Sequence, residues 1–544
     1  MDNSQLPTKV NTPTWLKILV ISLIGLGIFF RFAHLGQKLY WGDESFTSLA
    51  ISGHTLAEVK QEVLNHQDVL PVKTLDKYQH IDPERSVADT VNYLMTSDPQ
   101  HPPLYYVMVR LWAQVFGDSP AVVRSLSALF SLLIFPSVYW LCLELFESPV
   151  VGWIAMALIA VSPLQVFFAQ EARQYSLWMV TILLSSAALL RAIRLETFAS
   201  WAVYTLTLVL GLYTHLFTVL VAIAHGIYVL VRQQFCFTQT LLNYLLGSIT
   251  ACLMFLPWLI VFITNINTAL ELTYGWTSKI INNPWEQIAI CLIRATRIFF
   301  DINLTSDDAL WFNSLALEGS LLYSIPALIF SLVGIVYLIF FLVNQPIIKT
   351  GLFICLLGGF SSLLLITSDI IFGGIRSFQA RYQLPLYLSI QIAVAYVLAF
   401  HIFQEKSWQQ KISQLMMVGL LIAGLVSDVS LFKAESWWMQ SEGKYFIKIA
   451  QVINQSERPL LVIKNSSINV GTILALSHRL EPKVHLLPLP DDRLPTIPQD
   501  YSQIFFYDTN SSLFHQLEQD KTYSLTYSFK LPTPSGGFWR FDQL

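Results

Sequence analysis

Eleven long apolar segments run through the chain, and they limit the folds that it can adopt. A helix crosses the bilayer core with roughly 20 apolar residues. The chain is 54% hydrophobic and only 13% charged over its 544 residues, a composition that excludes a soluble globule for the whole chain. We therefore expect an all-α polytopic membrane protein with spans at 15–34, 121–143, 150–168, 175–192, 200–214, 216–232, 242–264, 321–343, 350–372, 383–403 and 412–430.

Two apolar stretches depart from a simple span. The run 200–232 is interrupted by "THLF", which divides it into two short helices around His215. The run 101–117 carries Arg110 in its middle and is too short to cross comfortably. An amphipathic helix that lies along the membrane surface fits this second stretch better.

Positive residues in the short connections predict the orientation, because cytoplasmic loops carry the excess of Lys and Arg. With eleven spans and a cytoplasmic N-terminus, most of these residues lie on the cytoplasmic side. Of the cytoplasmic connections, only 144–149 has no Lys or Arg in it or beside it and gives this orientation no support. We expect a multi-pass protein of the inner (plasma) membrane whose C-terminal region is external. The cytoplasmic positive residues are then Lys9, Lys17, Arg191, Arg194, Arg232, Lys349, Lys406 and Lys411.

The last part of the chain has the composition of a soluble domain. Strand-like runs such as "PLLVIKN" and "SQIFFYDT" alternate with helix-like runs such as "YFIKIAQVINQ", which predicts a small α/β domain. We expect a membrane module at 1–431, with an external first loop at 35–120, and an external domain at 432–544. This domain has no phosphate-binding loop, zinc spacing or nucleophile elbow, so we expect it to serve binding or structural support.

Acids, histidines and arginines gather at the external ends of the predicted spans. Charged groups in such places are costly unless they face protein or water. Side chains that merely snorkel would populate both membrane faces alike, so one-sided clustering indicates a site that faces outward. The candidates are Arg31, Asp43, Glu44, His101, Arg124, Glu171, Arg173, His215, Arg376 and Arg381.

Asp43 is the strongest candidate for catalysis. It follows Trp41 and Gly42 at a turn, where a carboxylate can point into an aromatic-lined cavity and act as a general base. Glu44 begins a helix-like run, and its charge can equally stabilise the N-terminus of that helix. Asp43 and Glu44 are therefore the predicted catalytic pair, and for Glu44 the helix-terminal role stays open.

Each predicted substrate-binding residue also has a structural alternative. His101 precedes two prolines and either contacts the substrate or packs locally. Glu171 and Arg173 either contact the substrate or pair with each other, which would stabilise little at a surface. Their place in the second external connection keeps both among the predicted substrate-binding residues.

The late external loop and several aromatic residues complete this set. Arg376 and Arg381 lie beside a Gly-Gly turn, and they either grip a phosphate by paired hydrogen bonds or anchor at lipid headgroups. Aromatic side chains near the loops are typical of the interfacial belt, while some are suited to stack on a sugar ring. We include Tyr175, Tyr382 and the span-breaking His215 in the predicted substrate site.

Four motifs in order resemble a known family. They are the Asp-Glu pair after the first span, "HPPLYYVMVRLW", "SPLQVFFAQEARQYSLWMV" and "ARYQLPLY". Together they are similar to the polyprenyl-phosphate-dependent GT-C glycosyltransferases, in the branch of protein O-mannosyltransferases and lipid A aminoarabinose transferases. The similarity covers roughly residues 15 to 400 and leaves out the tail at 432–544.

This resemblance implies a sugar donor on a polyprenyl monophosphate and transfer at the outer face. It implies that Asp43 is the base, assisted by Glu44, and that Arg381 binds the phosphate beside Tyr382. Glu171 stands where relatives often carry Asp. Arg376 has no firm counterpart and is added on its charge and position alone.

A single base and a phosphate leaving group predict inversion at the anomeric carbon. We expect the lipid bilayer, the donor, and a glycan, lipid or protein acceptor as partners. The net charge of −3 gives no reason to expect nucleic acid. We expect no metal, because Asp43, Glu44 and Glu171 have no fixed local spacing, and we expect no other cofactor.

Two other functions stay open on the sequence. A transporter or flippase of lipid-linked sugars would line a pathway with the same outward charges, and the sequence shows no broken helix pair or inverted repeat to favour it. A purely structural or binding role is the second of these functions. It would suit relatives that have lost the aspartate, whereas this chain retains Asp43.

Overall fold

The chain forms two compact units in the computed structural model. The helical unit, as we call the first, contains residues 1–35, 99–105 and 124–433, and the sheet unit contains residues 36–98, 106–123 and 434–544. Most of the first loop therefore shares a unit with the C-terminal region, whereas the sequence predicts that the loop belongs to the membrane module. The structure describes residues 12–66, 68–277, 283–302, 321–344, 348–404, 408–440, 443–464, 469–489, 500–501, 503–508, 523–530 and 537–543.

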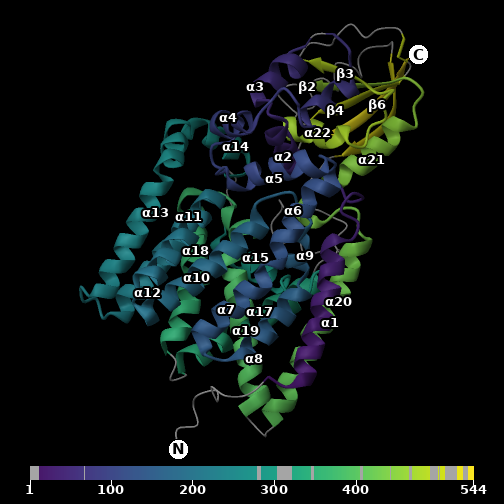
Figure 1. The fold of residues 1–544 in the computed structure, drawn as a ribbon. Helices are drawn as coiled ribbons and strands as arrows, with labels where there is room; N and C mark the ends of the chain where they lie inside the picture. The colour runs from purple at the N-terminus through teal and green to yellow at the C-terminus, as the bar shows by residue number, and fades with distance from the viewer. Residues whose placement is uncertain are drawn as a thin grey trace, which may run out of the picture. The chain divides into compact units, whose positions relative to one another are not determined.

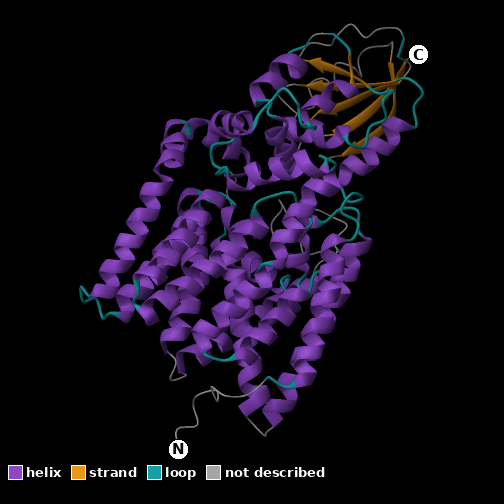
Figure 2. Ribbon diagram, in the orientation of Figure 1, coloured by secondary structure: helices purple, strands orange, loops and turns teal. Residues whose placement is uncertain are grey.

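Helices make up the described part of the helical unit (Figures 1 and 2). Helices α5 and α6 contribute residues to both units. The helices are α1 (Thr14–Phe32), α5 (Leu104–Phe116), α6 (Pro120–Leu132), α7 (Ile134–Phe146), α8 (Pro149–Ala160), α9 (Pro163–Ala169), α10 (Tyr175–Leu195), α11 (Phe198–Thr214), α12 (Thr218–Arg232), α13 (Gln239–Thr264), α14 (Ile266–Thr277), α15 (Pro284–Thr296), α17 (Leu321–Asn344), α18 (Ile348–Phe372), η3 (Arg376–Phe378), η4 (Ala380–Tyr382), α19 (Leu384–Gln404) and α20 (Trp408–Lys433).

The predicted spans coincide with these helices. Among the described residues, 7 helices are long and apolar enough to cross a membrane, or 8 if α8 and α9 together form one span. Three shorter apolar helices, α11, α12 and residues Pro326–Phe341 within α17, match the remaining predicted spans. The polytopic all-α architecture is thus confirmed. The run at 101–117 forms α5, and its position along the membrane surface stays a prediction.

One predicted span is broken. The axes of α8 and α9 differ by 66° across the residues Val161 and Ser162, so the expectation that no broken helix pair is present was wrong. Pro163 at the start of α9 is the physical reason, because proline cannot continue a helix and fits its first turn. Pro163 lies within an uninterrupted apolar run at 150–168, and that run by itself suggests one continuous span.

Arg31 closes the end of α8. Its guanidinium donates to the carbonyl oxygens of Ile159 and Ala160, each at 2.9 Å, and to that of Gly27 at 2.9 Å. The last carbonyls of a helix have no partner within the helix, so this buried arginine satisfies groups that would otherwise be costly. A Cβ at Gly27 would lie only 2.4 Å from the oxygen of Ala160, so glycine permits this close approach of α1 and α8.

The sheet unit combines a mixed sheet with short helices. Its six strands are ordered β1-β3-β2-β4-β6-β5, and this sheet confirms the predicted C-terminal α/β fold. The central strands β3, β2 and β4 are parallel, whereas β1, β6 and β5 pair in antiparallel fashion. The elements are α2 (Gly42–Ser52), α3 (Leu56–Val59), η1 (Lys60–Leu64), β1 (Leu70–Pro71), η2 (Val72–Tyr78), α4 (Val87–Ser97), η5 (Trp438–Gln440), α21 (Gly443–Asn454), β2 (Pro459–Lys464), α22 (Val470–Ser477), β3 (His485–Leu489), β4 (Gln503–Asp508), β5 (Tyr523–Lys530) and β6 (Gly537–Gln543).

The first loop contributes an edge strand to this sheet. Leu70 pairs with Leu486 and Pro71 with His485 in an antiparallel ladder. Proline is tolerated there because an edge strand leaves one side of its backbone without a ladder. The core on one face of the sheet contains buried apolar residues of β2, β3, β4 and β6, namely Leu460, Val462, Leu487, Leu489, Ile504, Phe506 and Phe541.

Helix α2, which carries Asp43, packs closely on α22. A Cβ at Gly471 would lie 2.7 Å from Cε2 of Phe46 and 3.0 Å from the backbone oxygen of Gly42. The segment before α2 is also fixed, since the backbone N–H of Leu39 donates to the oxygen of Glu435 at 2.8 Å. The C-terminal residues of the sheet unit therefore set the position of α2.

We expect Gly471→Ala to destabilise the sheet unit by about 1–3 kcal/mol, because an added methyl would force α2 away from α22. Thermal unfolding in detergent measures the effect. Gly36→Ala is the matched control, since its Cβ would make an ordinary contact of 3.4 Å with Ala121. Equal midpoints for the two variants would contradict the close packing of α2 on α22.

Candidate active site

The turn between α9 and α10 brings Glu171 and Arg173 into the interior of the helical unit. Each side chain is only 3% exposed, and the backbone N–H of Arg173 donates to the oxygen of Glu171 at 2.7 Å. The amide of Gln170 donates to the carbonyl oxygens of Phe30, at 2.6 Å, and Ala33, at 2.9 Å. The turn is thereby tied to the end of α1.

Arg173 contacts His101, which lies just before α5. The Nη2 atom of Arg173 and the Nε2 atom of His101 are 2.9 Å apart. Because arginine has no acceptor, the histidine must accept this hydrogen bond at Nε2, which places its own proton on Nδ1. The structure therefore brings together two of the predicted substrate-binding residues.

His215 lies in the break between α11 and α12, where the sequence predicted it. Its ring stacks on that of Trp178, with centroids 4.0 Å apart and an interplanar angle of 13°. Its Nδ1 accepts a hydrogen bond from the backbone N–H of Phe217 at 3.2 Å. The neutral ring therefore carries its proton on Nε2, the nitrogen that stays available as a donor.

Arg381 and Tyr382 lie in η4, which ends one residue before α19 begins. The guanidinium carbon of Arg381 lies 5.6 Å from the centroid of the Tyr382 ring, a cation–π distance. Tyr382 also makes an edge contact with His215, with centroids 6.2 Å apart, and a tilted contact with Phe217 at 4.9 Å. The late loop therefore reaches the break between α11 and α12.

These contacts define one group of side chains within the helical unit. Burial lowers the pKa of His215 well below its usual range, and the positive guanidinium groups of Arg381 and Arg173 lower this pKa further. Because His101 contacts Arg173, all four basic residues lie close together. The group, which we call the cationic–aromatic cluster, consists of His101, Arg173, Tyr175, Trp178, His215, Arg381 and Tyr382.

Arg376 is held by a buried carboxylate. Its Nη1 lies 3.0 Å from Oδ1 of Asp369 and donates to the oxygen of Gly373 at 2.7 Å. The other carboxylate oxygen of Asp369 accepts from the backbone N–H of Ser377 at 2.7 Å. Gly373 and Gly374 have φ values of 75° and 117°, so the turn uses conformations that favour glycine. These contacts shape the loop that leads to Arg381.

We expect Asp369→Ala to destabilise the protein by about 3 kcal/mol, because it leaves Arg376 and the N–H of Ser377 without their buried partner. The double variant Asp369→Leu with Arg376→Met is expected to recover part of this loss, since it removes the unpaired charge but still leaves the N–H of Ser377 without its acceptor. Thermal unfolding of both proteins in detergent measures the difference. If the double variant is less stable than the single one, Asp369 does not act through Arg376.

The predicted catalytic carboxylates lie in the sheet unit, in the first turn of α2. Glu44 is fully buried, and its Oε2 accepts from the backbone N–H of Trp41 at 3.4 Å. This contact is the helix-terminal role that the sequence left open for Glu44. Asp43 is partly exposed.

Sequence reasoning missed three residues that shape the helical unit. Trp178 and Phe217 lie inside apolar runs, where an aromatic residue gives no signal of its own. Asp369 had a usable signal, because an acid within an apolar span is rarely tolerated without a partner. Its distance of seven residues from Arg376 hid the pair, which forms only because the chain turns at Gly373 and Gly374.

The chain is similar to known proteins in sequence and in fold. Residues 100–261 match the family model described as dolichyl-phosphate-mannose-protein mannosyltransferase. ArnT from Cupriavidus metallidurans, bound to undecaprenyl phosphate, aligns with 12% identity and a TM-score of 0.50 over 96% of this chain and 97% of that one. The oligosaccharyltransferase AglB from Archaeoglobus fulgidus aligns with 10% identity and a TM-score of 0.49 over 96% and 74% of the two chains. No curated protein sequence matches the chain.

The family match includes part of the cationic–aromatic cluster. Its range of 100–261 contains His101, Arg173 and His215, while Arg381 lies beyond it. The alignment with ArnT shows a shared fold over nearly the full length of both chains. The predicted GT-C fold and the predicted glycosyltransferase class are both confirmed by these findings.

Proposed function

We propose that this chain, a membrane glycosyltransferase of the GT-C fold, moves a sugar from a polyprenyl-phosphate donor to an acceptor at the external membrane surface. The cationic–aromatic cluster is the observation that carries the proposal. Two arginines and two histidines meet there beside aromatic rings, within a unit of apolar helices. ArnT, which shares the fold, was crystallised with undecaprenyl phosphate.

Arg381 is the proposed ligand of the donor phosphate. A guanidinium presents paired N–H donors that match a phosphate, and the partial burial of Arg381 strengthens the attraction. Arg173 and the Nε2–H of His215 are further donors within the cluster. Tyr175 and Tyr382 supply ring faces on which a sugar can stack.

Asp43 is the proposed general base. It takes the proton of the acceptor hydroxyl while that oxygen forms a bond to the anomeric carbon. The bond between the anomeric carbon and the phosphate oxygen breaks, and the electron pair leaves with the polyprenyl phosphate. Positive groups at Arg381 and Arg173 stabilise this charge. Support comes from the place of Asp43 after the first span and from the partial exposure of this residue.

A single displacement of this kind predicts inversion of the anomeric centre. The product anomer, determined by NMR from a donor of known anomer, tests this step. Inversion supports attack by the acceptor itself. Retention would instead require two displacements and a nucleophile on the protein, and would contradict the role of Asp43 as a simple base.

The broken pair α8 and α9 favours a second candidate function, transport of a lipid-linked sugar. Helices that break within the membrane supply polar helix ends to substrates in many transporters, and the bend of 66° is such a feature. Its direct neighbour here is the turn with Glu171 and Arg173. A break that positions a catalytic turn serves a transferase equally well, so the two functions must be separated by experiment.

The test uses the purified full chain in detergent with a panel of polyprenyl-phosphate sugars that differ in the sugar. The proposed function predicts that one donor is consumed and that polyprenyl phosphate accumulates. The same donors in proteoliposomes provide the second arm, in which a fluorescent sugar reports movement across the bilayer. Movement of intact donor without cleavage in either arm would establish the transport function instead.

The proposed site faces the outside of the inner (plasma) membrane, with the N-terminus in the cytoplasm. The positive residues described at the predicted cytoplasmic ends of helices support this orientation. Arg191 and Arg194 pair with Glu144 there, at 3.4 and 2.7 Å. A membrane-impermeant label on a cysteine placed in the first loop tests it, and labelling only after the membrane is opened would reverse the assignment.

A further inference from the structure

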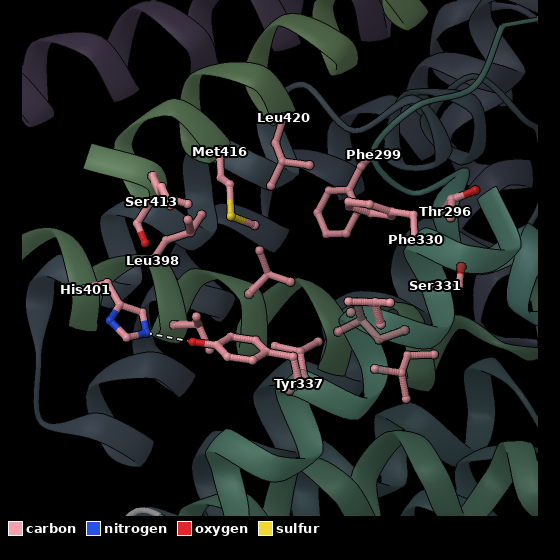
Figure 3. Close-up of a pocket in the computed structure, with 18 of the residues that line it drawn as sticks. Thr296, Phe299, Phe330, Ser331, Tyr337, Leu398, His401, Ser413, Met416 and Leu420 are labelled. Carbon is pink, nitrogen blue, oxygen red and sulfur yellow. Dashed lines mark hydrogen bonds between the residues drawn. The ribbon is translucent and has the colours of Figure 1, made fainter. Parts of the chain in front are cut away.

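The helical unit contains a cavity that the proposed reaction does not use. Its volume is about 410 Å³, and it lies among α15, α17, α19 and α20 (Figure 3). Most of its wall is apolar, with Phe330, Leu398, Met416 and Leu420 among the residues that line it. Such a wall suits a hydrocarbon chain and not a sugar or a phosphate.

Polar side chains gather at one end of the cavity. The hydroxyl of Tyr337 and the Nε2 atom of His401 lie 2.9 Å apart there (Figure 3), and Trp408 and Gln409 also line it. At the other end, Thr296 and Ser331 direct their hydroxyls to the carbonyl oxygens of Ile293 and Leu292. The cavity thus has a polar mouth and an apolar interior.

The polar mouth lies far from Arg381 along the same helix. Helix α19 begins at Leu384, directly after η4, and His401 is near its other end. At 1.5 Å per residue, Leu384 and His401 are separated by about 25 Å along the axis. The part of α19 that lines the cavity, from Ile390 to His401, is about 17 Å long, close to half of a hydrocarbon core of about 30 Å.

The start of α20, which lines this mouth with Trp408 and Gln409, has the side chains of a membrane–water boundary. Trp408 is 69% exposed, and Lys411 follows it by one helical turn with an exposed side chain. Tryptophan and lysine at the end of an apolar helix mark the headgroup level, and lysine attracts the phosphate of a lipid. The cavity depth then corresponds to one leaflet.

We propose that this cavity binds one acyl chain of a membrane phospholipid whose phosphate lies beside Lys411. The lipid is distinct from the sugar donor, because its phosphate lies at the opposite end of α19 from Arg381. An acyl chain that fills the cavity would stabilise the packing of α17 against α19 and α20. The inference uses no step of the proposed transfer reaction.

The test combines a substitution that fills the cavity with a photoreactive lipid whose cross-links to the protein are measured. The probe is phosphatidylglycerol with a diazirine in one acyl chain, and the cross-linked peptides of the full chain are mapped by mass spectrometry. Gly334 lines the cavity, and a Cβ there would meet no heavy atom within 4 Å, so we expect Gly334→Phe to direct its ring into the open space. Gly25→Phe on α1 is the matched control, since its Cβ also meets nothing within 4 Å and it does not line the cavity.

We expect the probe to label peptides of α17, α19 and α20 in the wild type and in Gly25→Phe. Labelling should fall at least tenfold in Gly334→Phe and several-fold in Lys411→Gln, while all variants elute as single species in gel filtration. Unchanged labelling in both of these variants would overturn the proposal. Preferential labelling of the same peptides by a diazirine-bearing polyprenyl phosphate would also overturn it, since the cavity would then hold the donor chain.

Discussion

Asp43→Asn is expected to lower the rate of sugar transfer by a factor of about 100 to 10,000, the usual contribution of a general base. Asparagine keeps the size of the side chain, but it replaces one carboxylate oxygen by a donor NH2 group and cannot accept the proton of the acceptor hydroxyl. Donor binding should change little, because the proposed phosphate ligand is Arg381. Turnover and donor affinity, measured separately on the purified protein, give the two parts of this result.

Glu44→Gln is the matched comparison for Asp43→Asn. Glu44 is buried and accepts from the backbone N–H of Trp41, so its loss should act mainly on the stability of α2. We expect a lower unfolding temperature with a smaller loss of turnover. If Glu44→Gln abolishes transfer while Asp43→Asn retains it, the base is Glu44 and the assignment within the pair is reversed.

Arg381→Ala is expected to weaken donor binding by about 30- to 150-fold. A lost hydrogen bond to a charged group costs about 2–3 kcal/mol, and 1.4 kcal/mol corresponds to a tenfold change in affinity. Arg381→Lys should recover part of the affinity, because lysine keeps the charge and loses the paired donors. Binding of polyprenyl phosphate without a sugar, measured by thermal shift or by calorimetry, isolates the phosphate contribution.

Arg376→Ala distinguishes a phosphate ligand from a residue that shapes the loop. The Arg376 guanidinium is engaged by Asp369 at 3.0 Å and by the oxygen of Gly373 at 2.7 Å. We expect its loss to lower stability more than donor affinity, in contrast to Arg381→Ala. A loss of affinity equal to that of Arg381→Ala would make both arginines phosphate ligands, as the sequence analysis suggested.

Features with a local signal were predictable from the sequence. Long apolar runs predicted the helices, since a bilayer imposes both their length and their composition. The polar break at "THLF" predicted that α11 and α12 are separate, with His215 between them. Four short motifs predicted the GT-C fold and the glycosyltransferase class, which the comparisons confirm.

Features that depend on distant parts of the chain were not predictable. The pairing of Leu70 with Leu486 joins the first loop to the C-terminal sheet, and nothing in either segment specifies the other. The stacking of His215 on Trp178 depends on how α10 packs beside the break after α11. The bend at Ser162 had a local cause in Pro163, but a run of apolar residues on both sides concealed it.

The position of an oxygen isotope in the products tests the central claim most directly. The wild type converts a polyprenyl-phosphate sugar that carries ¹⁸O between the anomeric carbon and phosphorus, and mass spectrometry measures the masses of the products. Transfer of the sugar breaks the bond from carbon to this oxygen, so the account predicts that ¹⁸O remains in the polyprenyl phosphate. Recovery of ¹⁸O in the sugar product would show that the phosphorus–oxygen bond breaks, and would contradict a glycosyltransferase mechanism.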